Sequence, residues 1–313
     1  MSKVHWLALA AVPGLGPVTA ARLIERFGRV EAVFDAAESE LLAIPQCRLT
    51  PDMARQMQGL PWDQLEAELT SLVDEGLQVF TWDDPEYPAN LSRLTNRPIV
   101  LFARGDLRAG DAAAVAIVGT REPSEQGRRL AHRVASEMAA RGLTVVSGLA
   151  LGIDTAAHRG ALDAAGRTLA VLGAGLRRPV HPRQNADLAE EISAHGAVLS
   201  ELMPGEPLRK PALMIRDRIV SGLSRAIIVV EAQEKSGSLD TAAKARSQGR
   251  LVYALPGSPG TTKLLAGGAE LLELKPADLD RLSERIHAQE GPASSDDRAD
   301  PSRGPAQLSL WAE

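Results

Sequence analysis

A regular alternation of apolar runs and helical stretches between residues 112 and 275 constrains the fold more than any other feature. The apolar runs are AAVAIVGT, LTVVSG, TLAVLGAG, AVLSEL, AIIVVEA and LVYALPG, and segments with helical spacing separate them. Continuous apolar strands that alternate with helices are typical of a parallel sheet covered on both faces. The connections are long enough for right-handed crossovers. The sequence therefore predicts an α/β fold with a doubly wound parallel, Rossmann-like sheet.

The chain is long enough for more than one folded unit. We expect a small N-terminal helical domain over residues 1–75, and a bridge plus the Rossmann-like domain over 76–275. In the first unit, the segment from Val12 to Gly28 combines a Pro-Gly turn with an amphipathic helix, which is typical of a helix-hairpin-helix (SAM-like) module. Backbone N–H groups at such a turn can hold a DNA phosphate, but a helical packing module without a ligand explains the pattern equally well.

Charge is distributed unevenly along the chain. Residues 276–313 hold eight acidic and four basic side chains, so they carry most of the formal net charge of −5 and are expected to be a mostly disordered acidic tail. The remaining body is close to neutral, which leaves room for a local basic groove. Two basic clusters occur in that body: Arg177, Arg178 and Arg183, and then Arg209, Lys210, Arg216 and Arg218.

The sequence has one cysteine, no signal-peptide pattern and no long apolar stretch, and these features indicate where the protein is found in the cell. The single cysteine, Cys47, excludes a disulfide framework and cysteine-rich metal sites. The N-terminal apolar run is too short for a signal peptide, and no apolar stretch reaches the length of about 18 residues that a membrane span requires. We therefore expect a cytoplasmic protein without a bound metal or cofactor.

Small and polar residues follow each predicted strand. The carboxyl ends of parallel strands meet at one edge of the sheet, and ligands bind beyond that edge. Glycine and serine there expose backbone N–H groups that can hold an anion, and Arg121 adds a planar donor. The sequence therefore predicts a ligand that carries phosphate. The strand-end residues are Gly119, Thr120, Arg121, Ser147, Gly148, Gly173, Gly175, Ser200, Glu201, Glu231, Lys235, Ser236, Gly237 and Gly257.

Known nucleotide and catalytic motifs are absent from this edge. The loops read GTREPSEQG and SGLALG rather than G-x-G-x-x-G, and there is no P-loop, H-E-x-x-H or G-x-S-x-G motif. Glu201 and Glu231 could form an acid/base pair. We instead expect these carboxylates to orient Arg121 or Arg216, because a free negative charge would repel an anionic ligand.

The chain closely resembles the DNA-processing protein A (DprA, also Smf) family over about residues 5–275. The most specific blocks are IVGTREPSEQG, VVSGLALGIDTAAHRGAL, AVLGAGL and SRAIIVVEAQEKSGSLDTAAKARSQGRLVYALPG, all in the family order. The hairpin-like N-terminal module and the YPANLSRL bridge match the family layout as well. So many blocks in one order are not expected by chance.

This resemblance implies a homodimer, without established catalytic activity, that binds single-stranded DNA in natural transformation. It would protect the incoming strand and help to load the RecA recombinase. The family motifs carry DNA binding over to Gly119, Thr120, Arg121, Ser147, Gly148, Lys210, Arg216, Arg218, Lys235, Ser236 and Gly237.

Two departures from the family pattern affect the expected binding. The usual F-P-x-R-N-R reads here Leu213-Met-Ile-Arg216-Asp217-Arg218, and Y-P-x-x-N begins with His181. Both positions lose an aromatic ring, and stacking of a base on such a ring is worth roughly 1–3 kcal/mol. We therefore expect weaker, more electrostatic DNA binding with a steep salt dependence.

Other functions remain open. The related LOG phosphoribohydrolases use P-G-G-x-G-T-x-x-E, and the comparable stretch here, 235–243, has no glutamate at that place. A nucleotide-sensing Rossmann domain would use the same loops for a small ligand. Finally, a short motif in the tail resembles the pentapeptide that docks on the replication sliding clamp, and its anchor residues would be Gln307, Leu308, Leu310 and Trp311.

Overall fold

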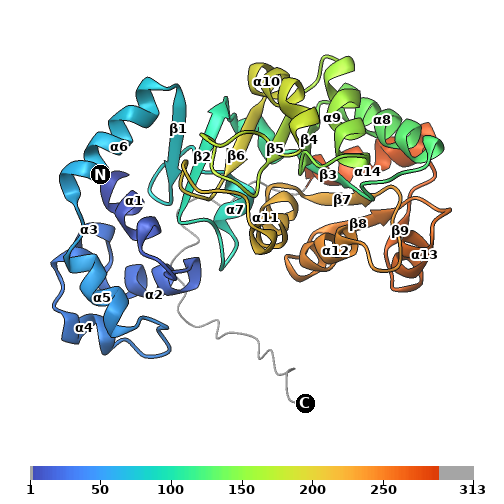
Figure 1. Cartoon of the computed structure of the whole chain (residues 1–313). Helices are drawn as coiled ribbons and strands as arrows, with labels where there is room; N and C mark the ends of the chain where they lie inside the picture. The colour runs from blue at the N-terminus through green and yellow to red at the C-terminus, as the bar shows by residue number, and fades with distance from the viewer. Residues whose placement is uncertain (1–2, 289–313) are drawn as a thin grey trace.

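A single nine-stranded sheet organises the molecule (Figure 1). The computed structural model describes residues 3–288. Its strands lie in the order β1-β2-β6-β5-β4-β3-β7-β8-β9, and all neighbours from β6 to β9 are parallel. The mixed α/β, Rossmann-like fold is thus confirmed. The strands are β1 Leu77–Thr81, β2 Val100–Gly105, β3 Ala114–Val118, β4 Thr144–Ser147, β5 Thr168–Val171, β6 Ala197–Ser200, β7 Ala226–Val229, β8 Leu251–Ala254 and β9 Glu270–Leu271.

Helices cover both faces of this sheet. In Figure 1, α8, α9, α10 and α14 lie above the sheet, and α11 and α12 lie below it. The helices are α1 Lys3–Ala11, α2 Pro17–Phe27, α3 Val30–Asp35, α4 Glu38–Leu42, α5 Pro51–Gln58, α6 Trp62–Asp74, α7 Ala89–Ser92, α8 Glu125–Ala140, α9 Ile153–Asp163, α10 Ala186–His195, α11 Lys210–Leu223, α12 Gly237–Ser247, α13 Pro259–Ala266 and α14 Pro276–Ala288.

Strand β3 illustrates why the buried strands are apolar throughout. All five of its residues are buried. Val115 and Ile117 join the hydrophobic cluster that includes residues of α8 and α9, whereas Ala116 and Val118 join the cluster that includes residues of α11. Successive side chains on a strand point to opposite faces, so a strand with helices on both sides has no polar face.

The order of the strands reverses at β3. From β3 the chain steps through β4, β5 and β6 in one direction, and α11 then returns it to β7 on the other side of β3. Ligands of open parallel sheets bind where the strand order reverses, because the loops on either side diverge there and leave a crevice. The fold therefore places its candidate site beyond the carboxyl ends of β3 and β7.

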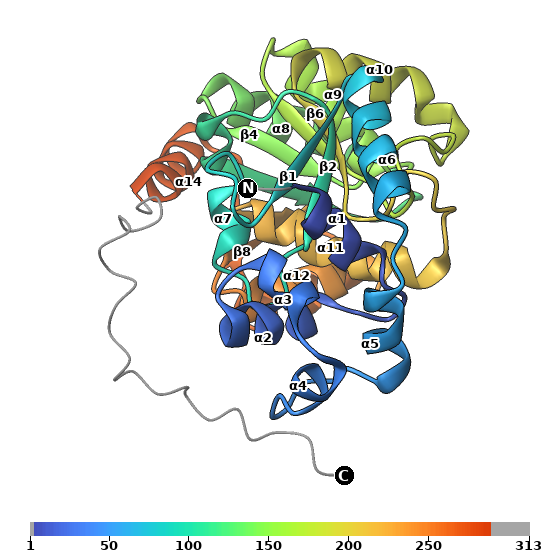
Figure 2. The ribbon, with the colours of Figure 1, turned by 90° about the vertical axis from the view of Figure 1, so that its left-hand side faces the viewer.

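Helices α1 to α6 form the N-terminal module, and they pack beside β1 and β2 (Figure 2). Their core, which includes Trp6 and Leu23, continues into Phe102 of β2 as one hydrophobic cluster. Strands β1 and β2 form an antiparallel pair, and β2 joins β6, so the segment expected to be a bridge extends the sheet. The module and the sheet thus share buried surface.

The segment from residue 276, expected to be mostly disordered, begins with a helix. Helix α14 buries Leu279, Leu282 and Ile286 in the cluster that contains α8 and α9. Residues 289–313, which include the proposed clamp-binding residues Gln307, Leu308, Leu310 and Trp311, lie outside the described residues. Among residues 3–288, no helix combines the length and the apolar character needed to cross a membrane.

Candidate nucleic-acid interface

The loops after β3 and β7 are held together at the point of reversal. The backbone N–H of Thr120 donates to the carbonyl of Glu231 at 2.8 Å. A Cβ at Gly119 would lie 2.7 Å from that same carbonyl oxygen and 2.5 Å from Ile153 Cγ1. Glycine is required at 119 because the two backbones approach so closely. This contact directs Arg121 out of the sheet edge, where it is exposed.

The loop after β4 makes room for an arginine from another element. A Cβ at Gly148 would lie 1.4 Å from Nη1 of Arg216, which comes from α11. The N–H groups of Gly148 and Ala150 donate to Oδ2 of Asp154 at 3.1 and 3.3 Å, so that carboxylate fixes the loop. Glycine at 148 therefore allows the guanidinium of Arg216 to rest against the backbone.

Arg216 is 6% exposed, yet its charge is only partly balanced. Its Nε lies 3.5 Å from Oδ1 of Asp217 and donates no hydrogen bond to any of the described residues. Burial raises the pKa of Asp154 to about 6, although the charge of Arg216 opposes this rise. Burial raises the pKa of Asp217 as well. A buried arginine with an unsatisfied donor costs free energy unless a ligand completes its contacts.

A polar cleft of about 350 Å³ opens at this point. It brings together seven of the predicted residues from the loops after β3 and β7 and from α11. Ser236 caps the first turn of α12, so the cleft also faces the amino end of that helix, where N–H groups favour an anion. The predicted residues that line it are Gly119, Thr120, Arg121, Arg216, Lys235, Ser236 and Gly237.

A narrower, mostly apolar pocket of about 80 Å³ adjoins the polar cleft. The two share Arg121, Ala150 and Arg216, so these side chains stand between them. The pocket lies beyond the ends of β4 and β5. Leu213 and His181, which stand where the family motifs have an aromatic ring, both line it. The other lining residues are Gly148, Leu151, Leu172, Gly173, Ala174, Pro179, Pro182 and Leu208, besides the three shared ones.

Three predicted contact residues line neither space, and these are Ser147, Lys210 and Arg218. The hydroxyl of Ser147 is fully buried and donates to the carbonyl of Ile117 at 2.7 Å. Arg218 is 7% exposed and its Nη1 donates to Oε1 of Glu201 at 3.0 Å. Sequence could not reveal this pairing, because Glu201 lies 17 residues earlier, in the loop after β6.

The expected role of the two strand-end glutamates was also wrong. Glu201 binds Arg218, as described above. Glu231 accepts from the N–H of Ser124 at 3.0 Å and from its hydroxyl at 2.7 Å, so it positions the start of α8. Neither carboxylate orients Arg121 or Arg216. Both instead hold backbone or buried side chains behind the cleft.

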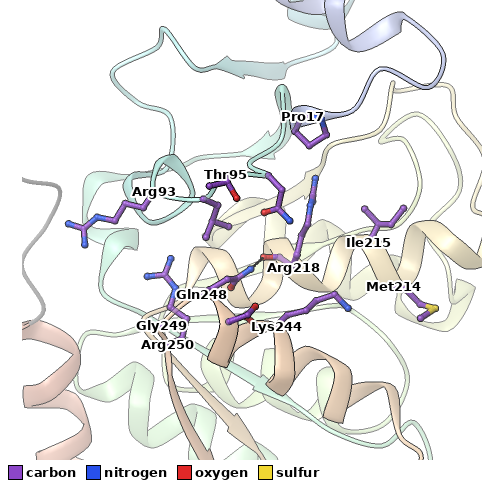
Figure 3. Close-up of a pocket in the computed structure, with 13 residues that line it drawn as sticks. Pro17, Arg93, Thr95, Met214, Ile215, Arg218, Lys244, Gln248, Gly249 and Arg250 are labelled. Carbon is purple, nitrogen blue, oxygen red and sulfur yellow. Dashed lines mark hydrogen bonds between the residues drawn. The ribbon is translucent and has the colours of Figure 1, made fainter. Parts of the chain in front are cut away.

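A larger groove of about 1090 Å³ lies on the other side of α11 (Figure 3). It runs between Pro17 of the hairpin-like module and the end of α12, and sequence reasoning missed it. Three of its cations are already engaged, since Arg218 pairs with Glu201 and Lys244 with Asp240. Arg250 donates to the carbonyls of Asn90 and Gly222 at 2.8 and 3.0 Å. This groove therefore offers less free positive charge than its size suggests.

The carboxyl edge of the sheet, in contrast to this groove, carries positive charges that are not paired within the described part of the chain. Six basic side chains on its loops make no hydrogen bond or ion pair with any residue between 3 and 288. Most other arginines of the described chain are paired, as Arg141 is with Glu137 and Asp280. Uncompensated charge gathered on one edge is the electrostatic mark of a polyanion site. The six are Arg121, Arg178, Arg183, Arg209, Lys210 and Lys235.

Comparisons with known proteins agree with this geometry. The family model described as DNA recombination-mediator protein A matches residues 78–287. Protein Smf of Synechocystis is 37% identical over 86% of this chain and 70% of its own length. DNA processing protein DprA of Streptococcus pneumoniae is 42% identical over 60% of this chain and 68% of its own length.

Two solved structures of DNA processing protein A are also similar to this chain. The crystal structure of DNA processing protein A from Streptococcus pneumoniae superposes with a TM-score of 0.77 at 33% identity, over 89% of this chain and 97% of that one. A structure that describes the single-stranded DNA binding mode of DNA processing protein A from Helicobacter pylori superposes with a TM-score of 0.59 at 29% identity. It covers 67% of this chain and 96% of the other.

Proposed function

This chain belongs to the DNA recombination-mediator protein A family, and from that premise we propose that its carboxyl-edge site binds single-stranded DNA. The observation that carries the proposal is the group of uncompensated cations around the polar cleft, above all Arg121 and Lys235. Related DprA from Helicobacter pylori has a described single-stranded DNA binding mode.

The two adjoining spaces suit the two parts of a nucleotide. Arg121, Lys235 and the amino end of α12 supply donors for a phosphate in the polar cleft. The apolar pocket beyond Arg216 is lined by leucine and proline side chains that suit the face of a base. A base can enter such a pocket only after it leaves a stacked duplex, so this arrangement selects single strands.

Binding, rather than catalysis, best fits the carboxylates near the cleft. Asp154 has the raised pKa that a catalytic base often shows. Its Oδ2, however, accepts hydrogen bonds from two backbone N–H groups, and the residue as a whole is only 7% exposed. Asp154 therefore holds the loop after β4 in place. Asp240, in the stretch comparable to the LOG motif, pairs with Lys244 on its own helix. We propose no catalytic residue.

The biological role follows the family. We propose that the protein shields a single strand as a homodimer and passes it to the RecA recombinase in transformation or recombination. Family membership supports these partners, and no surface of this chain is assigned to them. Clamp binding through residues 307–311 also stays a proposal. Deleting these five residues should abolish binding to the purified sliding clamp, and an unchanged affinity would exclude the idea.

A salt-titrated binding assay tests the main proposal. Wild-type protein should prefer oligo-dT over a duplex of the same length and over free nucleotides. Arg121→Ala should weaken oligo-dT binding and lower the slope of log K against log salt by about 0.7, the contribution of one phosphate contact on a single strand. Equal binding by the variant, or tighter binding of free nucleotides than of oligo-dT, would overturn the proposal and favour the small-ligand alternatives.

A further inference from the structure

Three arginines of the loop after β5 have different surroundings. Arg177 donates at 2.7 Å to Glu68 on α6 and at 2.7 Å to Glu75, the residue that follows α6. Arg178 and Arg183 are exposed, and neither makes a hydrogen bond or ion pair with the part of the chain between residues 3 and 288. The first arginine therefore joins the N-terminal module to the sheet, whereas the other two keep their charge available.

Arg178 and Arg183 rim a groove of about 590 Å³. Its lining comes from β2, β6, α10 and the loop after β5. A third cation, Arg104, is held in place by the hydrogen bond from its Nη2 to the carbonyl of Leu176 at 3.1 Å. Glu190 is the one acidic residue in the lining, and the floor is apolar: Leu172, Leu176, Pro179, Val180, Ala186, Ala189 and Val198.

This rimmed groove is continuous with the proposed DNA site. The polar cleft and the apolar pocket share Arg121 and Arg216. The apolar pocket and the rimmed groove in turn share Leu172 and Pro179, which belong to the end of β5 and its loop. The three spaces therefore follow one another from the start of α12 to the start of α10, and the rimmed groove continues along α10 as far as Ser193.

We propose that a bound DNA strand continues from the apolar pocket across the loop 176–183 into the rimmed groove, where Arg178 and Arg183 bind its backbone phosphates. This proposal rests on the proposed function, because it extends the path of the same strand. Single strands suit a path of this kind, since phosphates bind cations along the rim while bases contact an apolar floor. The groove beside Pro17 is not an alternative continuation, because its cations are engaged and it shares no lining residue with the apolar pocket.

The extended path has a consequence for oligonucleotide length. A short oligo-dT of about 4 nucleotides can fill the cleft and the pocket without reaching Arg178, whereas one of about 16 nucleotides can occupy the whole edge. The double variant Arg178→Ala/Arg183→Ala should therefore lose affinity only for the longer strand. Two lost phosphate contacts correspond to a slope reduced by about 1.4, or about 25-fold weaker binding at 0.1 M salt.

A matched control separates this effect from a change in overall charge. The double variant Arg108→Ala/Arg281→Ala removes the same charge from two exposed arginines outside all three spaces. It should bind oligonucleotides of both lengths like the wild type. Arg178→Lys/Arg183→Lys should recover most of the salt slope, because it keeps the charges. Circular dichroism of each variant shows whether the fold is intact.

The outcomes distinguish the path from the site itself. Equal binding of the long strand by Arg178→Ala/Arg183→Ala and by the control variant would overturn the path. So would an equal loss for the short and the long strand. If Arg121→Ala leaves both lengths unaffected, the proposed function fails instead, whatever the loop variants do.

Discussion

Leu213 stands in the wall of the apolar pocket at a position where the family motif has an aromatic ring. A leucine presents apolar surface to a base but no ring face for stacking. Leu213→Phe should therefore strengthen oligo-dT binding by roughly 1–3 kcal/mol. The slope of log K against log salt should not change, because no phosphate contact is added.

The control for this change lies on the same helix. Met214 is 61% exposed and lines the groove on the other side of α11. Met214→Phe should leave oligo-dT binding as it is. Equal gains from both variants would mean that added apolar surface, rather than a base contact at 213, strengthens binding.

Asp154 makes the site sensitive to pH. Burial raises its pKa to about 6, so the folded state holds a proton more tightly than the unfolded chain, whose aspartates titrate near 3.8. Stability from this group is therefore greatest at low pH and is lost as pH rises through about 4 to 6. Below pH 6 the neutral Asp154 no longer balances Arg216, and we expect DNA binding to tighten.

Oligo-dT affinity measured between pH 5 and 7.5 tests this expectation. The comparison is the single variant His181→Asn against the double variant His181→Asn/Asp154→Asn, so that the two proteins differ only at residue 154. The asparagine oxygen can still accept from Gly148, so the loop should stay in place. A rise in affinity that persists in Asp154→Asn would assign the pH dependence to another group, such as Asp217.

At the level of elements, the buried parallel strands were predictable. A strand that is covered by helices on both faces of the sheet carries apolar side chains on both faces, and so it appears in the sequence as a continuous apolar run. The place of β1 and β2 was not predictable, since an antiparallel pair such as Leu77 with Arg104 depends on long-range pairing. Helix α14 was hidden by the acidic composition of the residues after it. Its apolar spacing, Leu279, Leu282 and Ile286, was the available signal.

Part of the candidate site was predictable from the sequence, as part of the sheet was. Glycines and Arg121 follow the strands in sequence, so topology alone gathers them at one edge. Ser147 ends β4 and Arg218 follows Arg216 on α11 by two residues, but burial removes the first from the cleft and pairing with Glu201 removes the second. Arg177 and Arg178 are neighbours with opposite roles, and that difference depends on where α6 packs.

The contact between Arg177 and α6 makes a prediction about the N-terminal module. Arg177→Ala leaves Glu68 and Glu75 without their shared cation, and Arg177 also donates to Ser71 at 2.9 Å. These ion pairs are partly exposed, so the loss of stability should be modest, about 1 kcal/mol. Amide hydrogen exchange in α6 should become faster while α8 stays unchanged. Arg178→Ala, next in sequence, should leave α6 exchange unaffected, and faster exchange in both variants would contradict the assignment.

At the level of the whole molecule, net charge is a poor guide to the ligand. The formal charge is −5, yet the cations without partners concentrate on one edge of the sheet. Field strength at a surface depends on local, uncompensated charge and falls off over a Debye length of about 8 Å at physiological salt. A polyanion can therefore bind one edge of a protein that is acidic overall.

The acidic residues beyond α14 should then affect how fast DNA arrives. Residues 289–313 hold five acidic and two basic side chains, a net charge of −3. Removing them should raise the association rate with oligo-dT at low salt, because long-range repulsion decreases. The difference should vanish near 1 M salt, where the Debye length is about 3 Å. A full-length variant with the five acids changed to Asn and Gln should behave like the deletion in stopped-flow measurements. If only the deletion is faster, the segment slows binding by its bulk, and the electrostatic explanation is wrong.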